Sequence, residues 1–508
     1  MDRYLFFIIE EEVLLKFNYL FTPPMKIKTK CLSLIGFCFC AISLSAQYQS
    51  AARIENYGGS SSIFLNPASS SVFPLRWDLN IISGDFYIDN SVGYISNTSV
   101  FDLKNNADQI KAGWDMEPQG SSSLVADMYR DTLSDKYAQV STSINGPAFV
   151  FNTNGGQSIG AFYNFRAMGG SPKIPGSLNY YSYIDKQVDE FIDFSTANFS
   201  FLAWDEIGVH FSNRFLTGSG YISAGINLKY IRGYEAAYFS LNNDTDIQFA
   251  SSNQVVVNGL DFQYAYTTNN TDVADGAEYE LQPVGKGFAV DLGVNYVVED
   301  DSDTYKLRLG ASLNDIGGVT FKSNAEVHGL RGAQSITFDE STYQSFTTIE
   351  EVRDQASADV FNAIGLSQLD MPLSMAMPTS FSLQADYKIV EYVYASAVFI
   401  NRISFSPYAV KATNFISIAP RFEHRWGMFS IPVNITEYNR VKVGAAVRLG
   451  YFIIGTDDLS SFLGTSEFRS TDIYFGVKAN PFSIGSGSKG GRRNSSSGKR
   501  GKVKCYKF

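Results

Sequence analysis

Histidine and serine stand close together at one point of the chain where the pair could support hydrolysis. His210 and Ser212 are two residues apart on the polar face of an alternating segment. A serine nucleophile needs a histidine base, and the histidine needs an acid or amide that orients its ring. The sequence offers no third member beside this pair. We therefore predict that His210 is a hydrogen-bonded histidine and that the protein is not an enzyme, with an outer-membrane hydrolase kept as an alternative.

Charged side chains recur on the polar faces of other alternating segments. One interpretation is a charged pore that selects solutes. The other is a set of ion pairs that hold neighbouring segments together, because an isolated charge is costly in a narrow interior. We favour the ion pairs. The set that we predict to face an interior lumen is Arg166, Glu206, His210, Arg214, Lys229, Asp291, Lys306, Arg308, Asp386, Lys388, Lys442 and Arg448.

The sequence predicts no metal site and no cofactor. The chain has only 3 His and 4 Cys, which disfavours a His-rich metal centre. The acidic cluster of Asp300, Asp301 and Asp303 lacks the ligand number and the spaced glutamate of a calcium loop. Residues 485–490 match a G-x-G-x-x-G string, but no strand–helix–strand unit surrounds them, so we do not predict nucleotide binding.

The elements that would position these residues are many segments with strict two-residue alternation. Clear examples are residues 288–298, 305–313 and 441–453. A soluble sandwich would bury the apolar face, whereas a membrane barrel turns that face to lipid and its polar face to a lumen. The segments are long enough for a tilted span of about 9–11 residues, and Tyr and Phe gather near their ends. We therefore predict an all-β fold, a transmembrane antiparallel β-barrel.

The number of strands depends on residues 77–99. Counting gives about 13 or 14 strands, and since single-chain bacterial barrels have even numbers, we predict about 14, within a range of about 12–16. If residues 77–99 form one strand, the long connections face outward, but one last strand is lacking, which residues 502–508 could supply. If they form a hairpin, the count is even, but the long connections face the periplasm. The sequence leaves both arrangements open.

A glycine-rich stretch precedes the first strand. It contains Gly58 and Gly59 and continues to Asn66, Pro67 and Ala68. This pattern resembles the N-terminal hatch of the long-chain fatty-acid channel family, which lies in the lumen of a fourteen-stranded barrel. The resemblance implies a hatch with Gly58, Gly59, Asn66 and Pro67 as its motif, and it implies a small hydrophobic ligand. An ordinary Asn-Pro turn is the competing interpretation of the motif.

A wider resemblance covers most of the chain. The features that carry it are Ser45-Ala46-Gln47, the stretch from Tyr57 to Ala68, residues 474–478 and the short terminus at residues 504–508. They are similar to a family of Bacteroidota outer-membrane proteins known as domain of unknown function 5723. That resemblance implies an outer-membrane barrel. It implies no activity, because none is assigned to the family.

The beginning of the chain predicts export. Residues 25–46 have the three lysines, the apolar run and the small final residues of a secretory signal peptide. Residues 1–24 precede a second methionine, and we interpret them as an upstream extension. The rest divides into a hatch or lumen segment at 47–75, a barrel at 76–483 and a basic Ser/Gly-rich tail at 484–508. We predict that the protein resides in the outer membrane of a Gram-negative bacterium.

Composition narrows the class of partner. The formal charge is −10, and aromatic residues make up 15% of the chain. An acidic chain is not expected to bind nucleic acid, and one rich in aromatics is not expected to be disordered. The expected partners are outer-membrane lipid, a small hydrophobic ligand, and a periplasmic or surface protein. The leading hypothesis is passive transport of a small solute through a hatch-gated barrel, and the alternative is a structural barrel that anchors a secretion or surface assembly.

Overall fold

The computed structural model describes residues 49–481, with short gaps in the connections between strands. The gaps are residues 97, 107–110, 113–124, 130–133, 177–190, 252–253, 271–278, 301–304, 333–334, 344–345, 347 and 465–466. The predicted upstream extension, the predicted signal peptide and the basic tail lie outside the described residues.

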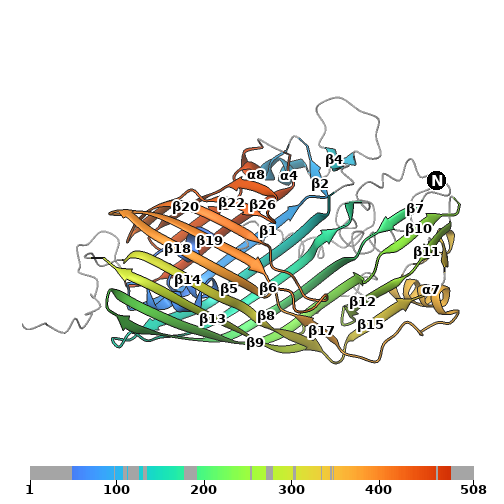
Figure 1. Cartoon of the computed structure of the whole chain (residues 1–508), viewed down its shortest axis with the longest axis horizontal. Helices are drawn as coiled ribbons and strands as arrows, with labels where there is room; N and C mark the ends of the chain where they lie inside the picture. Colours follow the sequence, from blue (N-terminus) through green and yellow to red (C-terminus); the bar gives the residue numbers. More distant parts are fainter. Residues whose placement is uncertain are drawn as a thin grey trace, which may run out of the picture.

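The chain forms a closed antiparallel barrel of 14 strands (Figure 1). Each barrel strand pairs with its sequence neighbours, and the last strand pairs with the first, which closes the barrel. The strands are β1 (Trp77–Asn90), β5 (Lys136–Asn152), β6 (Ser158–Ile174), β8 (Ala197–Thr217), β9 (Gly220–Leu241), β13 (Gly285–Glu299), β14 (Tyr305–Phe321), β17 with β18 (Leu373–Ala376 and Ser380–Val390), β19 (Val393–Arg402), β20 (Phe415–His424), β21 with β22 (Gly427–Ser430 and Val433–Thr436), β23 with β24 (Arg440–Val443 and Ala445–Leu449), β25 (Phe452–Thr456) and β26 (Ser470–Ala479).

The strand that the sequence reading missed is β25. Residues 441–453 read as one alternating segment, but the chain reverses at Gly450, whose φ of 58° is in the left-handed region that favours glycine. Residues 77–90 form the single strand β1, so the count is even. The first barrel strand then begins, and the last one ends, on the side of the short turns, whereas the long connections share the opposite side. This is the usual asymmetry of outer-membrane barrels.

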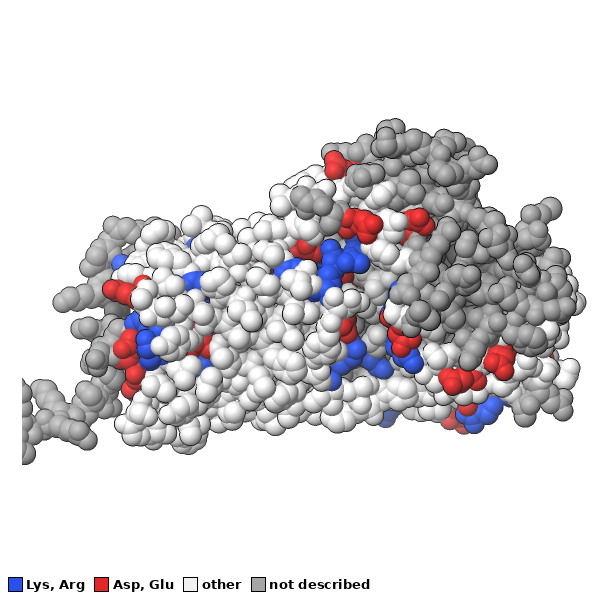
Figure 2. Space-filling model, turned by 45° about the horizontal axis from the view of Figure 1, so that its top comes forward, with Lys and Arg blue, Asp and Glu red and all other residues white. Residues whose placement is uncertain are grey.

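The two faces of the barrel wall differ as the alternation predicts. In β13, Phe288 is 71% exposed on the outside, whereas Asp291 is 1% exposed on the inside. Figure 2 shows a wide uncharged band across the barrel, with Lys, Arg, Asp and Glu gathered on either side of it. An apolar exterior around a polar interior suits a barrel in lipid. The predicted fold class, a transmembrane β-barrel, is therefore confirmed.

A smaller β-structure extends the barrel on the side of the long connections. Strands β12 (Asp261–Thr267) and β15 (Ala325–Arg331) pair with each other, and β12 also pairs with residues 237–241 of β9. A separate sheet follows the order β16-β11-β10-β7. That sheet comprises β7 (Phe191–Phe194), β10 (Thr245–Phe249), β11 (Gln254–Asn258) and β16 (Ile336–Asp339). Helix α7 (Ile349–Phe361), which begins with a capping box from Thr348 to Glu351, packs nearby, after the short helix α6 (Glu340–Tyr343).

The remaining elements are short. Strands β2 (Gly93–Ile95), β3 (Lys111–Ala112) and β4 (Val125–Met128) form a third sheet, beside helices α4 (Val100–Asn106) and α8 (Ser460–Leu463). Among the described residues, no helix is long and apolar enough to cross a bilayer.

The segment before β1 lies inside the barrel. Its described part, residues 49–75, is called the hatch segment below, and it contains α3 (Ser50–Ile54) and the 3₁₀ helices η1 (Gly59–Phe64) and η2 (Pro67–Ser71). Figure 1 shows these short blue helices within the barrel, behind the strands of its wall. Apolar side chains of the segment, such as Ile63 and Leu65, pack against inward side chains of the wall, including Phe162 and Ile400. The hatch segment is therefore part of the packed interior of the barrel.

The apolar exterior generates a test of the membrane orientation of β8. We expect Val209→Arg, in the middle of the exposed apolar face, to lower the free energy of unfolding by about 2–4 kcal/mol, because a cation would lie deep in hydrocarbon. Leu216→Arg, at the end of the same strand, should cost only about 0–1 kcal/mol. Equilibrium unfolding in urea from lipid vesicles measures both values. Equal costs at the two positions would contradict this placement of the apolar face of β8 in the membrane.

Candidate functional site in the lumen

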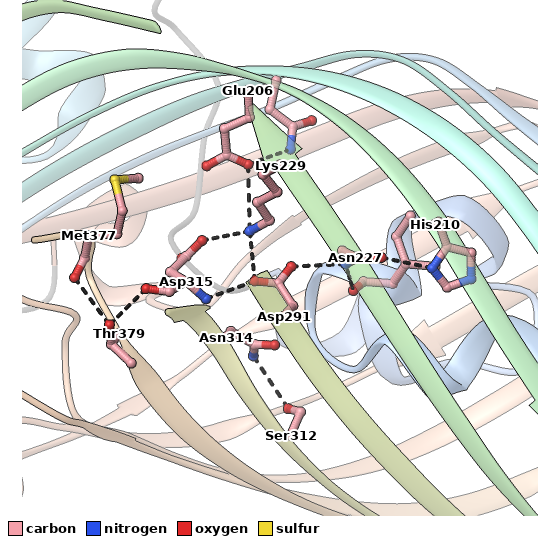
Figure 3. A network of polar contacts seen from close by, with 12 residues as sticks. Glu206, His210, Asn227, Lys229, Asp291, Ser312, Asn314, Asp315, Met377 and Thr379 are labelled. Carbon is pink, nitrogen blue, oxygen red and sulfur yellow. Dashed lines mark hydrogen bonds and ion pairs between the residues drawn. The ribbon is translucent and has the colours of Figure 1, made fainter. Parts of the chain in front are cut away.

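Five charged side chains meet in the lumen, one from each of five neighbouring barrel strands. Lys229 Nζ lies 2.6 Å from Asp315 Oδ1, 2.8 Å from Asp291 Oδ1 and 3.6 Å from Glu206 Oε2. Arg166 Nη1 lies 2.9 Å from both Glu206 Oε1 and Asp315 Oδ2. Figure 3 shows Glu206, Asp291 and Asp315 converging on the Lys229 ammonium group. These residues form the ionic cluster, in which three carboxylates face two cations and every cation is paired.

The ionic cluster lies between two different layers of inward side chains. The side of the long connections is called the outer side below. Two residues along each strand toward the outer side, the same inward faces carry Met168, Trp204, Ile231 and Ala289, which belong to one buried hydrophobic cluster. This set, with its neighbours Leu202, Val319, Met375 and Met377, is called the apolar layer. Two residues toward the short-turn side, the faces carry Asn164, Gly208, Asn227 and Gly293. The lumen therefore changes from apolar to ionic to polar along its axis, and the hatch segment follows.

Trp204 joins the first two layers. Its indole Nε1 donates to Glu206 Oε1 over 2.8 Å, and the Arg166 guanidinium lies 4.8 Å from the ring centroid. The side chain is thus apolar toward the outer side and polar toward the ionic cluster. A ligand that disturbs either layer would change the surroundings of this indole.

A chain of hydrogen bonds connects the ionic cluster to the hatch segment. Asp291 Oδ2 accepts from Asn227 Nδ2 over 2.9 Å, and Asn227 Oδ1 lies 2.7 Å from His210 Nδ1 (Figure 3). On the other side of the ring, His210 Nε2 lies 2.7 Å from Ser70 Oγ in η2, which also lies 2.8 Å from Ser212 Oγ. Both ring nitrogens of His210 thus lie within hydrogen-bond distance of a partner. We call the contact of His210 with Ser70 the latch.

The partners fix the tautomer of His210. The Asn227 amide nitrogen donates to Asp291 and to the Ile63 carbonyl, so Asn227 Oδ1 is the acceptor that faces the ring. His210 Nδ1 must then carry a proton, and Nε2 of the neutral ring accepts from the Ser70 hydroxyl. Ser70, His210 and Asn227 therefore stand in the order of nucleophile, base and orienting amide.

This order does not make the latch a hydrolytic site. Ser70 and Asn227 are fully buried between the hatch segment and the wall. A substrate would reach Ser70 only after the hatch segment moved, and that movement would take Ser70 away from His210, which belongs to the wall. The arrangement therefore supports a structural contact between the hatch segment and the wall better than the alternative of a hydrolase.

A second ion network holds the other side of the hatch segment. Arg421 lies 2.8 Å from Asp386 and 2.7 Å from Glu423, and Arg308 also pairs with Asp386 at 3.2 Å. Glu423 accepts from the backbone and side chain of Asn56 in the hatch segment. Arg448 pairs with Glu55 of the hatch segment at 2.7 Å. Arg308 also donates to the Ile54 carbonyl of the hatch segment. Of the predicted lumen residues, Arg308 and Arg448 thus contact this segment directly, and Asp386 pairs with Arg308.

The other predicted charged residues lie outside these two networks. Arg214 donates to the backbone carbonyl of Ser71 in the hatch segment, and Lys442 pairs with Asp89 at 2.8 Å. Lys388 pairs with Asp300 at 2.8 Å near the short turns. Lys306 lies at the strand end over the ring of the outward-facing Tyr387, because a register shift at the start of β14 turns Tyr305 inward. Lys306 therefore does not join the lumen networks.

The predicted hatch motif makes close contacts with the wall. Gly59 has a φ of 51°, and a Cβ there would meet the side chain of Asp78 at 2.4 Å. The carbonyl of Gly58 accepts from Lys478. Asn66 caps η2 by accepting from Ala68 N, and its amide donates to Asn295 and to Gln384. The structure thus gives the motif residues structural roles in this segment.

Two wall glycines leave the space that the motif occupies. A Cβ at Gly225 would lie 2.4 Å from the Pro67 carbonyl carbon, and one at Gly293 would lie 2.1 Å from Asn66 Oδ1. Pro67 therefore packs directly on the strand backbone of β9. A larger residue on the wall would push η2 away.

A cavity of about 70 Å³ lies between the ionic cluster and the hatch segment. Its lining combines Phe64 and Leu65 of the hatch segment with Met168 of the apolar layer and with charged residues of the cluster. Within the described residues, no group of three or more His, Cys, Asp or Glu side chains is placed to hold a metal ion.

Comparison with known proteins gives the family. The model of the family of unknown function DUF5723 matches residues 67–457. The chain belongs to this family. No curated protein sequence matches the chain. The family predicted from the sequence is confirmed.

The solved structures that match the chain have low sequence identity. The Ralstonia pickettii toluene transporter TbuX is 10% identical, with coverage of 83% of this chain and 94% of that chain and a TM-score of 0.37. A deletion mutant of the monoaromatic hydrocarbon channel TodX is 12% identical, with coverage of 83% and 94% and a TM-score of 0.38. A Pseudomonas aeruginosa FadL homologue is 9% identical, with coverage of 82% and 92% and a TM-score of 0.19. These scores are low, so the fold of the DUF5723 chain rests on its own strand pairing.

Sequence reasoning missed several members of the site in this DUF5723 protein. Asn227 shares a strand face with Lys229, and that alternation could have found it. Asp315 breaks the alternation of β14 because its backbone has a φ of 57°. Ser70 and Glu55 come from the hatch segment, where no periodicity shows which side chains face the wall.

The close approach of hatch and wall generates a second prediction. Gly225→Ala should displace η2 while the barrel stays folded, since the new methyl group would overlap hatch backbone atoms. We expect amide hydrogen exchange of residues 59–73 to become at least about tenfold faster, as measured by mass spectrometry. Gly218→Ala is the control, because nothing lies within 4 Å of a Cβ there. Unchanged exchange in Gly225→Ala would show that η2 does not depend on this contact.

Proposed function

We propose that this DUF5723 protein lets a small, largely hydrophobic solute cross the outer membrane passively through its barrel, with the hatch segment as the gate. The observation that carries the proposal is the order of layers in the lumen. An apolar layer on the outer side leads to the cavity, and the hatch segment forms the next wall of that cavity.

The composition of the apolar layer supports a hydrophobic solute. Met168, Met375 and Met377 are buried there beside Trp204 and Phe321. Methionine side chains are flexible and polarizable, so they can repack around an apolar molecule more readily than branched residues. A lumen built for hydrated ions would instead carry polar side chains at this depth.

The connection between β19 and β20 covers the apolar layer. Val410 packs into the layer and Tyr408 packs against it. The Ala409 carbonyl accepts from Ser200, and the Tyr408 hydroxyl donates to Gln263 over 2.6 Å. Lys411 also donates to Asn198, and the Tyr408 ring stacks on Tyr238. This strap adds no strand to the barrel sheet, so we take it as the outer entrance, which opens without the loss of an inter-strand hydrogen bond.

The bonding of the hatch segment supports its role as a gate. Its polar contacts with the wall are made mainly through wall side chains, such as Asp78, Arg448 and His210, and it adds no strand to the barrel sheet. The segment can therefore move without the loss of any inter-strand hydrogen bond. The barrel would remain closed to lipid while its lumen opened.

A second candidate function is a barrel that anchors a surface assembly. Exposed apolar side chains in the outer connections favour it, among them Ile364, Leu366 and Phe405. Such side chains are typical of protein contact surfaces when they gather in one place. An anchor would not need a movable hatch segment, so a test that immobilises this segment separates the two functions.

A reversible disulfide across the latch provides that test. The Oγ atoms of Ser70 and Ser212 lie 2.8 Å apart, so Ser70→Cys with Ser212→Cys should form a disulfide, whose S–S length is about 2.05 Å. The native Cys505 is replaced by serine in all variants. We expect the oxidised protein in outer-membrane vesicles to take up radiolabelled dodecanol at the rate of vesicles without the protein, and reduction to restore uptake.

The control is Ser70→Cys alone, whose uptake should not respond to oxidant. Mass spectrometry of the linked peptides verifies that the disulfide has formed. Equal uptake by the oxidised and reduced double variant would reject the gate and favour the anchoring function.

A further inference from the structure

The cavity beside the ionic cluster contains hydrogen-bond acceptors that the protein does not use. We propose that it binds the polar head of the transported solute, and that this head is a hydrogen-bond donor, a hydroxyl or an amine, rather than a carboxylate. The inference rests on the proposed function and adds the chemical class of the solute, an amphiphile with its apolar body in the apolar layer.

Three polar side chains of the cavity carry an oxygen without a hydrogen-bond partner. They are Ser141 on β5, Asn164 on β6 and Asn314 on β14, which are 5%, 2% and 8% exposed. The unpaired atoms are Ser141 Oγ, Asn164 Oδ1 and Asn314 Oδ1. Burial of a polar atom without a partner is unfavourable, so a ligand or water that bonds to these atoms would be stabilised.

The amide orientations are set by other contacts. Asn314 Nδ2 donates to the carbonyl of Leu65 in the hatch segment over 3.1 Å, and Asn164 Nδ2 lies 3.4 Å from Glu206 Oε2. Both nitrogens face acceptors, so both amides present their oxygens as the unused atoms. An amide oxygen accepts hydrogen bonds and cannot donate them. The free capacity of the cavity is therefore mainly acceptor capacity.

The cations near the cavity are already committed to the protein. Lys229 has three donors, and three carboxylate groups surround it, those of Glu206, Asp291 and Asp315. Arg166 bonds to two of the same carboxylates, and Arg53 lies 3.7 Å from Asp85 on the same lining. A carboxylate head would find negative charge in excess and would have to compete for these cations. A donating head would meet the unused acceptors without breaking an ion pair.

The position of the cavity suits an amphiphile. Met168 belongs both to the cavity lining and to the apolar layer, so the two spaces adjoin. Phe64 and Leu65 of the hatch segment line the opposite side. A volume of about 70 Å³ has room for a few water molecules or one small head group. The head of a solute whose body lies in the apolar layer would thus contact the gate.

Trp204 offers a direct readout of binding. The chain has 4 Trp, and Trp77→Phe, Trp114→Phe and Trp426→Phe leave Trp204 as the single emitter. The experiment titrates this variant of the purified protein with octanol, octylamine and octanoate, three probes with the same alkyl chain. Binding is followed by Trp204 fluorescence, with correction for partition of each probe into the detergent.

We expect octanol and octylamine to bind at least about tenfold tighter than octanoate. Ser141→Ala with Asn164→Leu should weaken octanol binding by about tenfold and leave octanoate binding unchanged. Ser158→Ala is the matched control, because Ser158 is also buried on β6 with an unpaired hydroxyl but does not line the cavity. Ser141→Ala alone, with an expected loss of about threefold, serves if the double variant does not fold.

Two results would overturn the inference. The first is octanoate binding as tight as octanol binding, and the second is octanol binding that the cavity variants do not alter, which means that the cavity holds only water. Failure of the proposed transport gives a different pattern, in which head-group selectivity persists but the oxidised latch variant takes up dodecanol normally. The opposite pattern is also possible to observe: oxidation of the latch variant stops uptake, but all three probes bind equally well. That pattern would contradict only the head-group inference.

Discussion

The closure of an alternating sheet in lipid leaves the polar side chains of its strands only one place, the lumen. The exterior must be apolar because nothing in the bilayer core can satisfy a charge, so every inward residue faces other inward residues. Lys229 illustrates the consequence, since its ammonium group is buried and needs the three carboxylates around it. The hatch segment supplies partners where the wall has none, as Glu55 does for Arg448. The ion pairs of the lumen and the position of the hatch segment thus follow from the same constraint.

Glycines of the wall complete the fit between barrel and hatch segment. Gly225 and Gly293 have no Cβ where Pro67 and Asn66 approach, so η2 lies against strand backbone and its side chains reach deep into the wall. Ser70 then comes within hydrogen-bond distance of His210. A wall with larger side chains at these two positions would hold the segment farther away, and the link between the ionic cluster and the hatch segment would not exist.

The two-residue periodicity of a strand predicts which side chains face inward, but it does not predict turns or breaks in the strand. It placed Glu206, Lys229 and Asp291 on inward faces, and the structure brings these three together. It could not show the reversal at Gly450, since the alternation continues through the turn, and it could not show Asp315, whose backbone breaks the alternation. The contacts of the hatch segment could not be predicted from the sequence for another reason. Ser70 meets His210 across 140 positions of sequence, and no local pattern encodes that distance.

In the proposed function, a hydrophobic solute has to pass the ionic cluster. Breaking a buried ion pair outright costs about 3–5 kcal/mol, so passage through an intact cluster is unfavourable. A donating head group that first binds the unused acceptors of the cavity would only then, on moving further, donate to Glu206 or Asp315 and replace the bonds of Lys229. Lys229 also shares Asp291 with Asn227, and Asn227 orients the ring of His210 against Ser70. In the proposed function, a solute that redistributes the bonds of this cluster would therefore act on the latch through one continuous chain of contacts, because the charges that oppose its passage are hydrogen-bonded through Asn227 and His210 to the hatch segment.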